Sequence, residues 1–329
     1  MPVMITEDTS IDYDIQGSGP PLILINGLGF GRWAWFKQLP ALSRHFRTIT
    51  FDIRGEVDLK DGVSTLVDEV VALLDHLRVR KAHVLGTSLG GFVAQELALK
   101  RPDLVDRLIL VCTSYGGRGP ETMSPQALAT MLGFGSFSPE GAVRQGLEAA
   151  TSDAYRAEKP EEFDHILHAR LADSLPLVAY SRQAMAGARF DVSSEIESIF
   201  APTLVIHGSE DRYVPLANAA ALAEALPKAE LKVLEDAGHL VFIEQSAKVN
   251  RKVISFLKAG EKPKKRGSKD RRASAGRARK KVKGPVKVGA ERPCKGRGSA
   301  RWSVAEGNLM DRENVGTSLL VSVIKEDRM

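Results

Sequence analysis

Short apolar runs alternate with amphipathic helical patterns over most of the first 258 residues. The runs are four to six residues long and almost purely apolar, which predicts strands buried on both faces, as in a parallel sheet. They are Leu22–Ile25, Phe46–Phe51, Ala82–Leu85, Leu108–Cys112, Thr203–His207 and Leu231–Leu234. Between them, Ser64–Leu77 places its apolar residues on one helical face. The alternation predicts an α/β fold, with a mostly parallel central sheet flanked by helices and an opening hairpin over Met4–Ile15.

The pattern changes between Tyr115 and Phe200, where only helical signals occur. They cover Pro125–Leu132, Pro139–Ala150, Glu161–Ala172 and Leu175–Ala188. A helical block between two strands of one sheet predicts a lid over the carboxyl ends of the strands, where such sheets bind ligands. We therefore expect a core formed by residues 1–114 and 201–258, with a helical cap over residues 115–200.

Residues 259–329 differ from the rest of the chain in composition. Lys258–Arg301 contains 18 basic and 3 acidic residues, whereas the whole chain has a net charge of only +5, so the preceding part is net acidic. Few apolar residues accompany these charges, which predicts a disordered tail. The tail could bind nucleic acid or another acidic surface. It lacks a recognisable binding motif, so we favour the alternative of a solvated extension.

Composition and termini limit the class of protein. With 43% hydrophobic and 26% charged residues, the chain has a globular, soluble profile. Met1–Asp8 lacks a signal pattern, and no apolar run approaches the length of a membrane span. Cys112 lies in an apolar run and Cys294 in the basic tail, so the two cysteines do not indicate a disulfide or a metal site. We expect a cytoplasmic protein without a cofactor or a metal.

Gly86–Gly90 has the pattern Gly-x-Ser-x-Gly. It follows the apolar run Ala82–Leu85 and precedes the helical run Phe92–Lys100, which is the strand–turn–helix context that gives the pattern meaning. Glycine at both ends lets the backbones approach closely, while the central residue adopts a strained conformation. The pattern predicts that the Ser88 hydroxyl stands at the carboxyl end of a strand, beside the free N–H groups of a helix N-terminus. A simple helix N-cap is the alternative for Ser88.

An acid and a histidine follow Ser88 in the chain, each after a predicted strand. Asp211 comes after Thr203–His207, and His239 comes after Leu231–Leu234. A serine hydroxyl is a poor nucleophile unless an imidazole takes its proton and a buried carboxylate orients that imidazole. Since the carboxyl ends of parallel strands share one edge of a sheet, we expect these three side chains to act together.

Other residues compete for these roles. Glu210 and Asp236 are the nearest alternatives for the acid, and Asp211 could instead be a turn residue. His239 could cap the helix that follows it, but the other six histidines have no comparable position. We favour Asp211 and His239 because each lies in the loop directly after a buried strand.

Asn26–Gly29 follows the first buried strand and forms a flexible loop that could approach a ligand through its backbone. We expect the N–H groups of Leu28 and Leu89 to hold a developing oxyanion. Trp33 and Trp35 could line an apolar substrate pocket, or they could pack into the core; the sequence leaves both open.

Taken together, the motifs resemble the α/β-hydrolase superfamily, in particular its bacterial esterase, lipase and lactonase-like branch with a helical cap. The resemblance covers residues 3–258 and rests on Asn26–Gly29, Asp52–Gly55, Gly86–Gly91, His207–Pro215 and Ala237–His239. It implies Ser88 as the nucleophile, Asp211 as the acid and His239 as the general base. For Arg54 we favour a structural role in holding loops together over a catalytic one.

The chain departs from the family pattern at two places. Asn26 stands where the family usually has histidine, which affects the packing of the oxyanion loop. Glu56–Leu59 replaces a longer loop, which changes one edge of the expected pocket.

These observations predict a serine hydrolase that cleaves a small-molecule carboxylic ester or lactone through an acyl-enzyme. A carbon–carbon bond hydrolase and a cofactor-free haloperoxidase or perhydrolase would use the same triad. Ser88 disfavours the branches of the superfamily that use an aspartate nucleophile. A non-catalytic ligand-binding relative is a further alternative, although it would not need all three residues.

Overall fold

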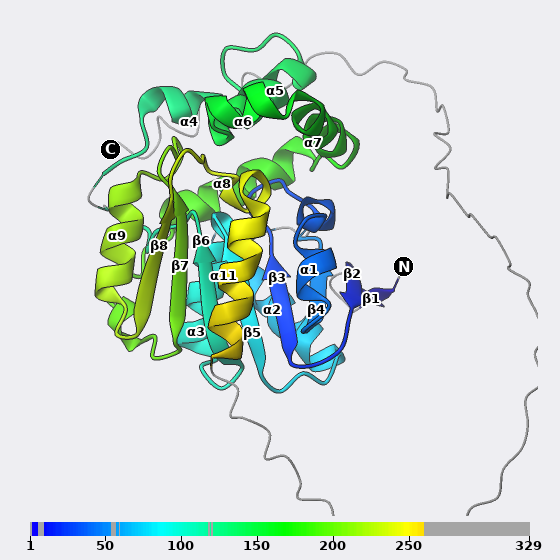
Figure 1. Cartoon of the computed structure of the whole chain (residues 1–329), viewed down its shortest axis with the longest axis vertical. Helices are drawn as coiled ribbons and strands as arrows, with labels where there is room; N and C mark the ends of the chain where they lie inside the picture. Colours follow the sequence, from blue (N-terminus) through cyan, green and yellow to red (C-terminus); the bar gives the residue numbers. More distant parts are fainter. Residues whose placement is uncertain are drawn as a thin grey trace, which may run out of the picture. The chain divides into compact units, whose positions relative to one another are not determined.

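The computed structural model describes residues 2–5, 10–53, 57–58, 60–117, 119 and 121–259. These residues form an eight-stranded sheet with the order β1-β2-β4-β3-β5-β6-β7-β8 (Figure 1). The strands are β1 (Val3–Ile5), β2 (Ser10–Gln16), β3 (Pro21–Ile25), β4 (Arg47–Phe51), β5 (Ala82–Thr87), β6 (Val105–Val111), β7 (Thr203–Gly208) and β8 (Ala229–Leu234). β1 and β2 pair antiparallel, and all neighbours from β4 to β8 are parallel. The predicted mostly parallel α/β architecture is therefore confirmed.

Helices cover both faces of the sheet. Outside the segment between β6 and β7 they are η1 (Arg32–Trp35), α1 (Leu39–Leu42), α2 (Val63–His76), α3 (Leu89–Lys100), α9 (Leu216–Ala225), α10 (Val241–Glu244) and α11 (Ser246–Lys258). On β3, Ile23 packs in an apolar cluster with α2, α3 and α9, whereas Leu22 and Leu24 pack in a second cluster with α1 and α11. Successive strand residues point to opposite faces. Burial on both faces explains the apolar runs of β3, β5, β6 and β7. The prediction was wrong for Leu231–Leu234, because β8 lies at the edge of the sheet and Leu231 is 38% exposed.

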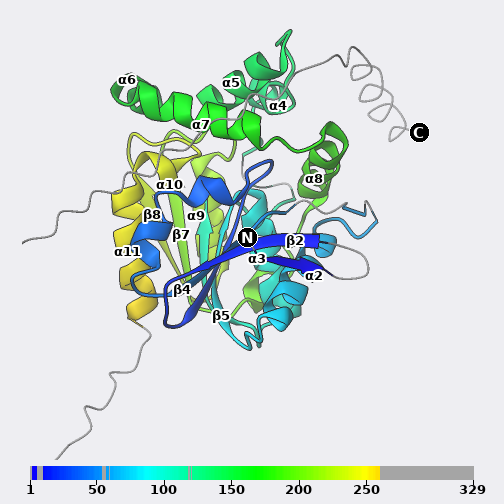
Figure 2. The same cartoon turned by 90° about the vertical axis from the view of Figure 1, so that its right-hand side faces the viewer.

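A helical insertion connects β6 to β7. It contains α4 (Pro125–Met131), α5 (Pro139–Ala150), α6 (Asp153–Glu158), α7 (Pro160–Ala172) and α8 (Leu177–Arg189). Figures 1 and 2 show α4 to α7 as a layer beyond the end of the sheet at which β6 leads into the insertion. The segment therefore lies over the strand ends that carry the candidate residues.

The two ends of this insertion meet in a short antiparallel neck. The N–H of Gly117 donates to the carbonyl of Phe190 at 2.9 Å, and the N–H of Val192 donates to the carbonyl of Tyr115 at 3.0 Å. A side chain at residue 116, a glycine with φ of 77°, would clash with the Phe190 carbonyl. The chain thus enters and leaves the insertion at one point of the core.

Three further local predictions were wrong. α6 was not predicted; Ser152 starts it by accepting a hydrogen bond from the N–H of Tyr155 at 3.2 Å. The single helix expected after His239 is split at Gln245, whose ψ of 40° leaves the helical range. Cys112 was expected inside a strand but follows β6 with a positive φ of 49°.

Some predictions lie outside the described residues. These include the basic tail from residue 260 onward, together with Arg54 and Gly55. Within the described part of the chain, no helix combines the length and the apolar character needed to cross a membrane.

Candidate active site

Ser88 stands on the turn that joins β5 to α3. Its φ of 52° and ψ of −119° lie in a region that non-glycine residues rarely adopt. A side chain at residue 86 would clash with the carbonyl of Gly90, and one at residue 90 would clash with the carbonyl of Ile25. Both glycines are therefore sterically required for this turn. The Ser88 side chain makes no capping hydrogen bond to α3, so the N-cap alternative is not observed.

The backbone N–H groups of Leu28 and Leu89 are the candidates for holding an oxyanion near Ser88. The loop after β3 touches the serine, because a Cβ at residue 27 would lie 3.2 Å from Ser88 Cβ. Within the described part of the chain, the N–H groups of Leu28 and Leu89 donate no hydrogen bond to another residue. N–H groups without another partner beside a serine can donate hydrogen bonds to a developing oxyanion and stabilise it.

Asn26 anchors the same loop. Its side chain is 1% exposed, and Nδ2 donates to the carbonyl of Phe51 at 3.3 Å. The residue that departs from the family pattern thus ties the loop to the end of β4.

His239 and Asp211 form a buried pair at the ends of β8 and β7. His239 Nδ1 lies 2.8 Å from Asp211 Oδ2, and the N–H groups of Tyr213 and Val214 each donate to Asp211 Oδ1 at 2.9 Å. Burial opposes ionisation, but the charge and hydrogen bond of His239, with His207 and the backbone, lower the pKa of Asp211 below its ordinary value. An ionised, fully bonded carboxylate holds His239 with Nδ1 protonated and leaves Nε2 available to accept a proton.

The competing acids lie elsewhere. Glu210 and Asp236 are both exposed. The Glu210 N–H donates to the carbonyl of Ala237, and the Asp236 N–H donates to Ser209 Oγ at 3.0 Å. Asp211 is the acid that contacts His239.

Within the described part of the chain, no hydrogen bond joins the Ser88 hydroxyl to the His239 ring. Both nevertheless follow strands of one parallel block, since β5, β6, β7 and β8 are consecutive neighbours in the sheet. Such hydrogen bonds often form fully only when substrate is bound.

Three potential metal ligands lie together among the described residues: Asp211 itself, Cys112 and His207. Their donor atoms lie within 4.8 Å of one another. His207 Nε2 lies 2.8 Å from the carbonyl of Val214, and Asp211 is occupied as described above. Burial lowers the pKa of His207 and raises the pKa of the Cys112 thiol well above its ordinary value. A neutral imidazole and a protonated thiol are better suited to packing around Asp211 than to binding a cation.

The two predicted pocket tryptophans have different surroundings. Trp35 is fully buried in the core, where its ring centroid lies 5.1 Å from that of Phe242. This placement follows the core alternative and removes Trp35 from the pocket wall. Trp33 is half-buried, and its ring lies 5.4 Å from Phe30, the residue after the oxyanion loop.

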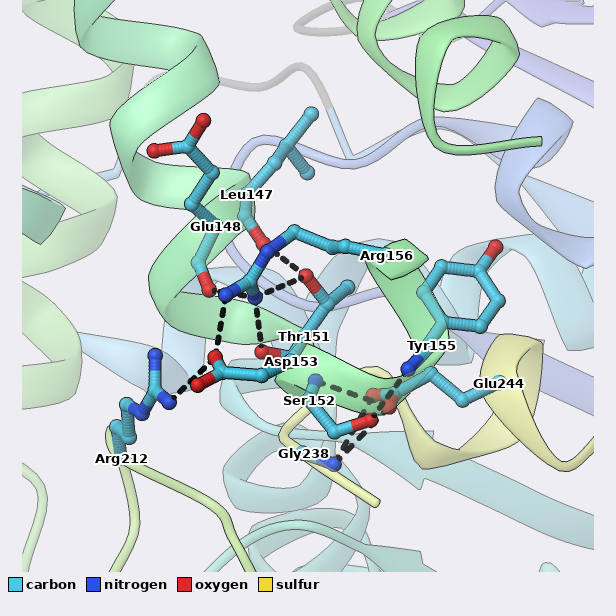
Figure 3. A network of polar contacts seen from close by, with 10 residues as sticks. All are labelled: Leu147, Glu148, Thr151, Ser152, Asp153, Tyr155, Arg156, Arg212, Gly238 and Glu244. Atoms are coloured by element: carbon cyan, nitrogen blue, oxygen red, sulfur yellow. Dashed lines mark hydrogen bonds and ion pairs between the residues drawn. The ribbon is translucent and has the colours of Figure 1, made fainter. Parts of the chain in front are cut away.

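Sequence reasoning missed Glu244, which fixes the loop that carries His239. The carboxylate accepts from the N–H of Gly238 at 3.1 Å and from the N–H of Ser152 at 3.0 Å (Figure 3). Burial raises the pKa of Glu244, while these N–H groups partly offset the effect. A lone carboxylate after the apolar Val241–Ile243 is the signal that could have revealed it.

A second contact joins the start of α6 to the loop that carries Asp211. Arg212, the residue after Asp211, places Nη2 2.8 Å from Asp153 Oδ1, and Arg156 pairs with the same carboxylate (Figure 3). The start of α6 is therefore attached to both loops that carry the candidate acid and base.

Comparison with known proteins agrees with this geometry. The sequence model of the alpha/beta hydrolase fold family matches residues 20–246. The chain belongs to the α/β-hydrolase family. Like other folds of this class, it carries its candidate site at the carboxyl ends of parallel strands.

Several α/β-hydrolases are similar over nearly their full length. A putative carbamate hydrolase RutD from Pseudomonas syringae pv. syringae (strain B728a) is 32% identical over 249 residues, covering 74% of this chain and 95% of the relative. The crystal structure of the enol-lactonase from Burkholderia xenovorans LB400 is 26% identical with a TM-score of 0.68, covering 78% of this chain and 99% of that one. A meta-cleavage product hydrolase from Pseudomonas fluorescens IP01 is 27% identical with a TM-score of 0.66, covering 77% and 95%. These similarities support hydrolase activity and leave the bond that is cleaved open.

Proposed function

We propose that the protein is a serine hydrolase that cleaves a carboxylic ester or lactone. The observation that carries the proposal is the buried pair of His239 Nδ1 and Asp211 Oδ2 at 2.8 Å, on the same sheet edge as the strained Ser88. Nucleophilic catalysis by a serine requires a buried carboxylate–imidazole pair at the same edge of the sheet as the serine.

In the proposed mechanism, Ser88 Oγ attacks the substrate carbonyl carbon while His239 Nε2 takes the hydroxyl proton. The N–H groups of Leu28 and Leu89 donate to the oxyanion. Asp211 remains ionised and stabilises the imidazolium, which then gives its proton to the leaving alcohol as the C–O bond breaks. A water molecule next loses a proton to His239 Nε2 as it attacks the acyl carbonyl carbon. His239 then returns this proton to Ser88 Oγ as the bond between that oxygen and the acyl carbon breaks, which releases the carboxylic acid and restores the serine hydroxyl.

The helical insertion is proposed to act as a cap that selects the substrate. Its α7 places Arg170 over Phe30 next to the oxyanion loop, and its α6 is attached to the loops of Asp211 and His239. A cytoplasmic location and a small acyl substrate fit the proposal.

A carbon–carbon bond hydrolase is the second candidate, because the meta-cleavage product hydrolase is about as similar as the enol-lactonase. It would use the same serine, base and acid with a different leaving group. Hydrolysis of a carbamate would likewise need only a different group on the carbonyl carbon.

The test is hydrolysis of 4-nitrophenyl esters of increasing acyl length by the full-length protein. Ser88→Ala should lower kcat/KM at least ~1,000-fold, since removal of a triad nucleophile leaves only binding and oxyanion stabilisation. Ser138→Ala is a matched control, because Ser138 caps α5 on the exposed side of the insertion. Undiminished activity of Ser88→Ala would overturn the mechanism. Failure of the wild type on every ester would favour the carbon–carbon candidate.

A further inference from the structure

Arg170 places a guanidinium group against the oxyanion loop. The residue lies on α7, and a side chain at residue 29 would overlap its guanidinium, so Gly29 leaves the space that the group fills. Gly29 also has a φ of 68°, which favours glycine independently of that space. The loop of Leu28 is thus shaped around the arginine.

The Arg170 side chain is half-buried, and part of its guanidinium has no hydrogen bond. Nη1 is inaccessible to solvent and has no hydrogen-bond partner among the described residues. Asp173, three residues later, attracts the charge but forms no hydrogen bond with it. Cζ lies 4.5 Å from the ring centroid of Phe30 and 5.9 Å from that of Tyr180. Ring faces attract a cation but cannot accept the planar set of N–H bonds that a guanidinium offers.

Arg170 lies near both the serine side and the histidine side of the candidate site. On one side the loop from Gly29 back to Gly27 reaches Ser88, whose Cβ would lie 3.2 Å from a Cβ at residue 27. On the other side Tyr213 is an electrostatic neighbour of Arg170, and its ring lies edge-on to His239 with centroids 5.3 Å apart. A substrate whose carbonyl lies at Ser88 would therefore have a cation beside the loop that carries Leu28.

Burial lowers the pKa of Arg170 below its ordinary value, yet an arginine stays charged at neutral pH. Removing a charge from water without a partner is unfavourable, and a bound anion reverses this. The fork of N–H donors matches a carboxylate better than a spherical ion.

We propose that Arg170 binds a carboxylate of the substrate, so that the enzyme acts on esters or lactones that carry a free carboxylate at a distance from the scissile carbonyl. The proposal rests on the proposed hydrolase function and deepens it by naming the substrate class. It assigns α7 the role of selecting charge, while Ser88 and His239 perform the bond cleavage.

The test compares mono-4-nitrophenyl adipate with its neutral methyl ester at constant ionic strength, with the uncatalysed rates subtracted. The wild type should prefer the carboxylate in kcat/KM by at least about tenfold. Arg170→Gln should lower this ratio at least about tenfold, and Arg170→Lys should retain part of it because the charge remains. Arg144→Gln removes a cation from α5 that is paired with Asp164, and it should leave the ratio unchanged. A wild-type ratio near one, or an equal ratio in Arg170→Gln, would overturn the proposal.

Binding of adipate separates this proposal from the proposed function. If the wild type hydrolyses neither ester, hydrolase activity on esters fails, but the carboxylate site is still decided by calorimetric titration of adipate into the full-length Ser88→Ala protein. The additional Arg170→Gln substitution should weaken adipate binding at least about tenfold. No binding before the substitution, or equal binding after it, would refute the site.

Discussion

Replacing Glu69 with glutamine should stabilise the protein, and the gain should grow as the pH rises. Glu69 lies on α2, is 7% exposed, and its Oε2 has no hydrogen-bond partner among the described residues. Burial raises its pKa from the ordinary 4.5 to about 7. Because the folded state holds the proton more tightly than the unfolded chain does, Glu69 favours folding below about pH 4.5. This contribution is lost as the pH rises through about 7.

The size of the effect follows from the two pKa values. Each pKa unit corresponds to about 1.4 kcal/mol. Full ionisation of Glu69 should therefore destabilise the fold by about 3 kcal/mol relative to a group that stays neutral. Integrated over pH, the advantage of Glu69→Gln in the free energy of unfolding should rise from about 1 kcal/mol at pH 5 to about 3 kcal/mol at pH 8.

The assay is urea unfolding of the full-length wild type and variant at several pH values, followed by far-UV circular dichroism. The difference between the two proteins cancels the other titrating groups. Any fixed penalty for the glutamine amide shifts all points equally, so the slope with pH is the observable. Asp68→Asn is a matched control, because Asp68 is the exposed neighbour of Glu69 on the same helix. A difference that stays constant or falls between pH 5 and 8 would refute the reasoning.

Two further predictions concern the site. Gly90→Ala should lower ester kcat/KM more than tenfold, because the added methyl would clash with the Ile25 carbonyl and move the serine turn. The comparison is with Gly146→Ala in α5, where the added methyl would make only an ordinary contact with Tyr213 Oη at 3.7 Å, and equal activity of the two variants would contradict the steric argument. Glu244→Ala should cost roughly 2–5 kcal/mol of stability by leaving two buried N–H groups unpaired. Glu244→Gln should cost less because one acceptor oxygen remains. Urea unfolding measures both, and equal stability of the two variants would show that the N–H bonds are unimportant.

The serine turn was predictable from the sequence because its constraints are local and steric. Gly86 and Gly90 are separated from Ser88 by one residue each, so the crowding that requires them is encoded in five consecutive residues. The pairing of Asp211 with His239 was also predictable, because consecutive parallel strands end at one edge and the two residues follow adjacent strands.

Residues whose roles depend on distant packing were not predictable in the same way. Arg170 lies on a helix between exposed neighbours such as His168, and only the fold brings its guanidinium against the loop after β3. Glu69 looks like a solvent-facing residue of an amphipathic helix until α3 and α8 pack around α2. Trp35 shows the reverse case, since its aromatic character suits a pocket or a core equally and the packing of Phe242 decides.

The neck at Tyr115–Gly117 and Phe190–Val192 makes the insertion an exchangeable module. Because its ends are hydrogen-bonded to each other, a segment of different length or sequence could replace α4–α8 without altering the spacing of β6 and β7. Evolution could then change the substrate range of this scaffold by recombination at one point, while Ser88 and the strands beneath it stay unaltered. The exchange has one condition: the new segment must present a backbone N–H to Glu244, as Ser152 does. Natural chimaeras of the family should therefore differ freely over the outer helices and keep the short stretch that lies on the histidine loop.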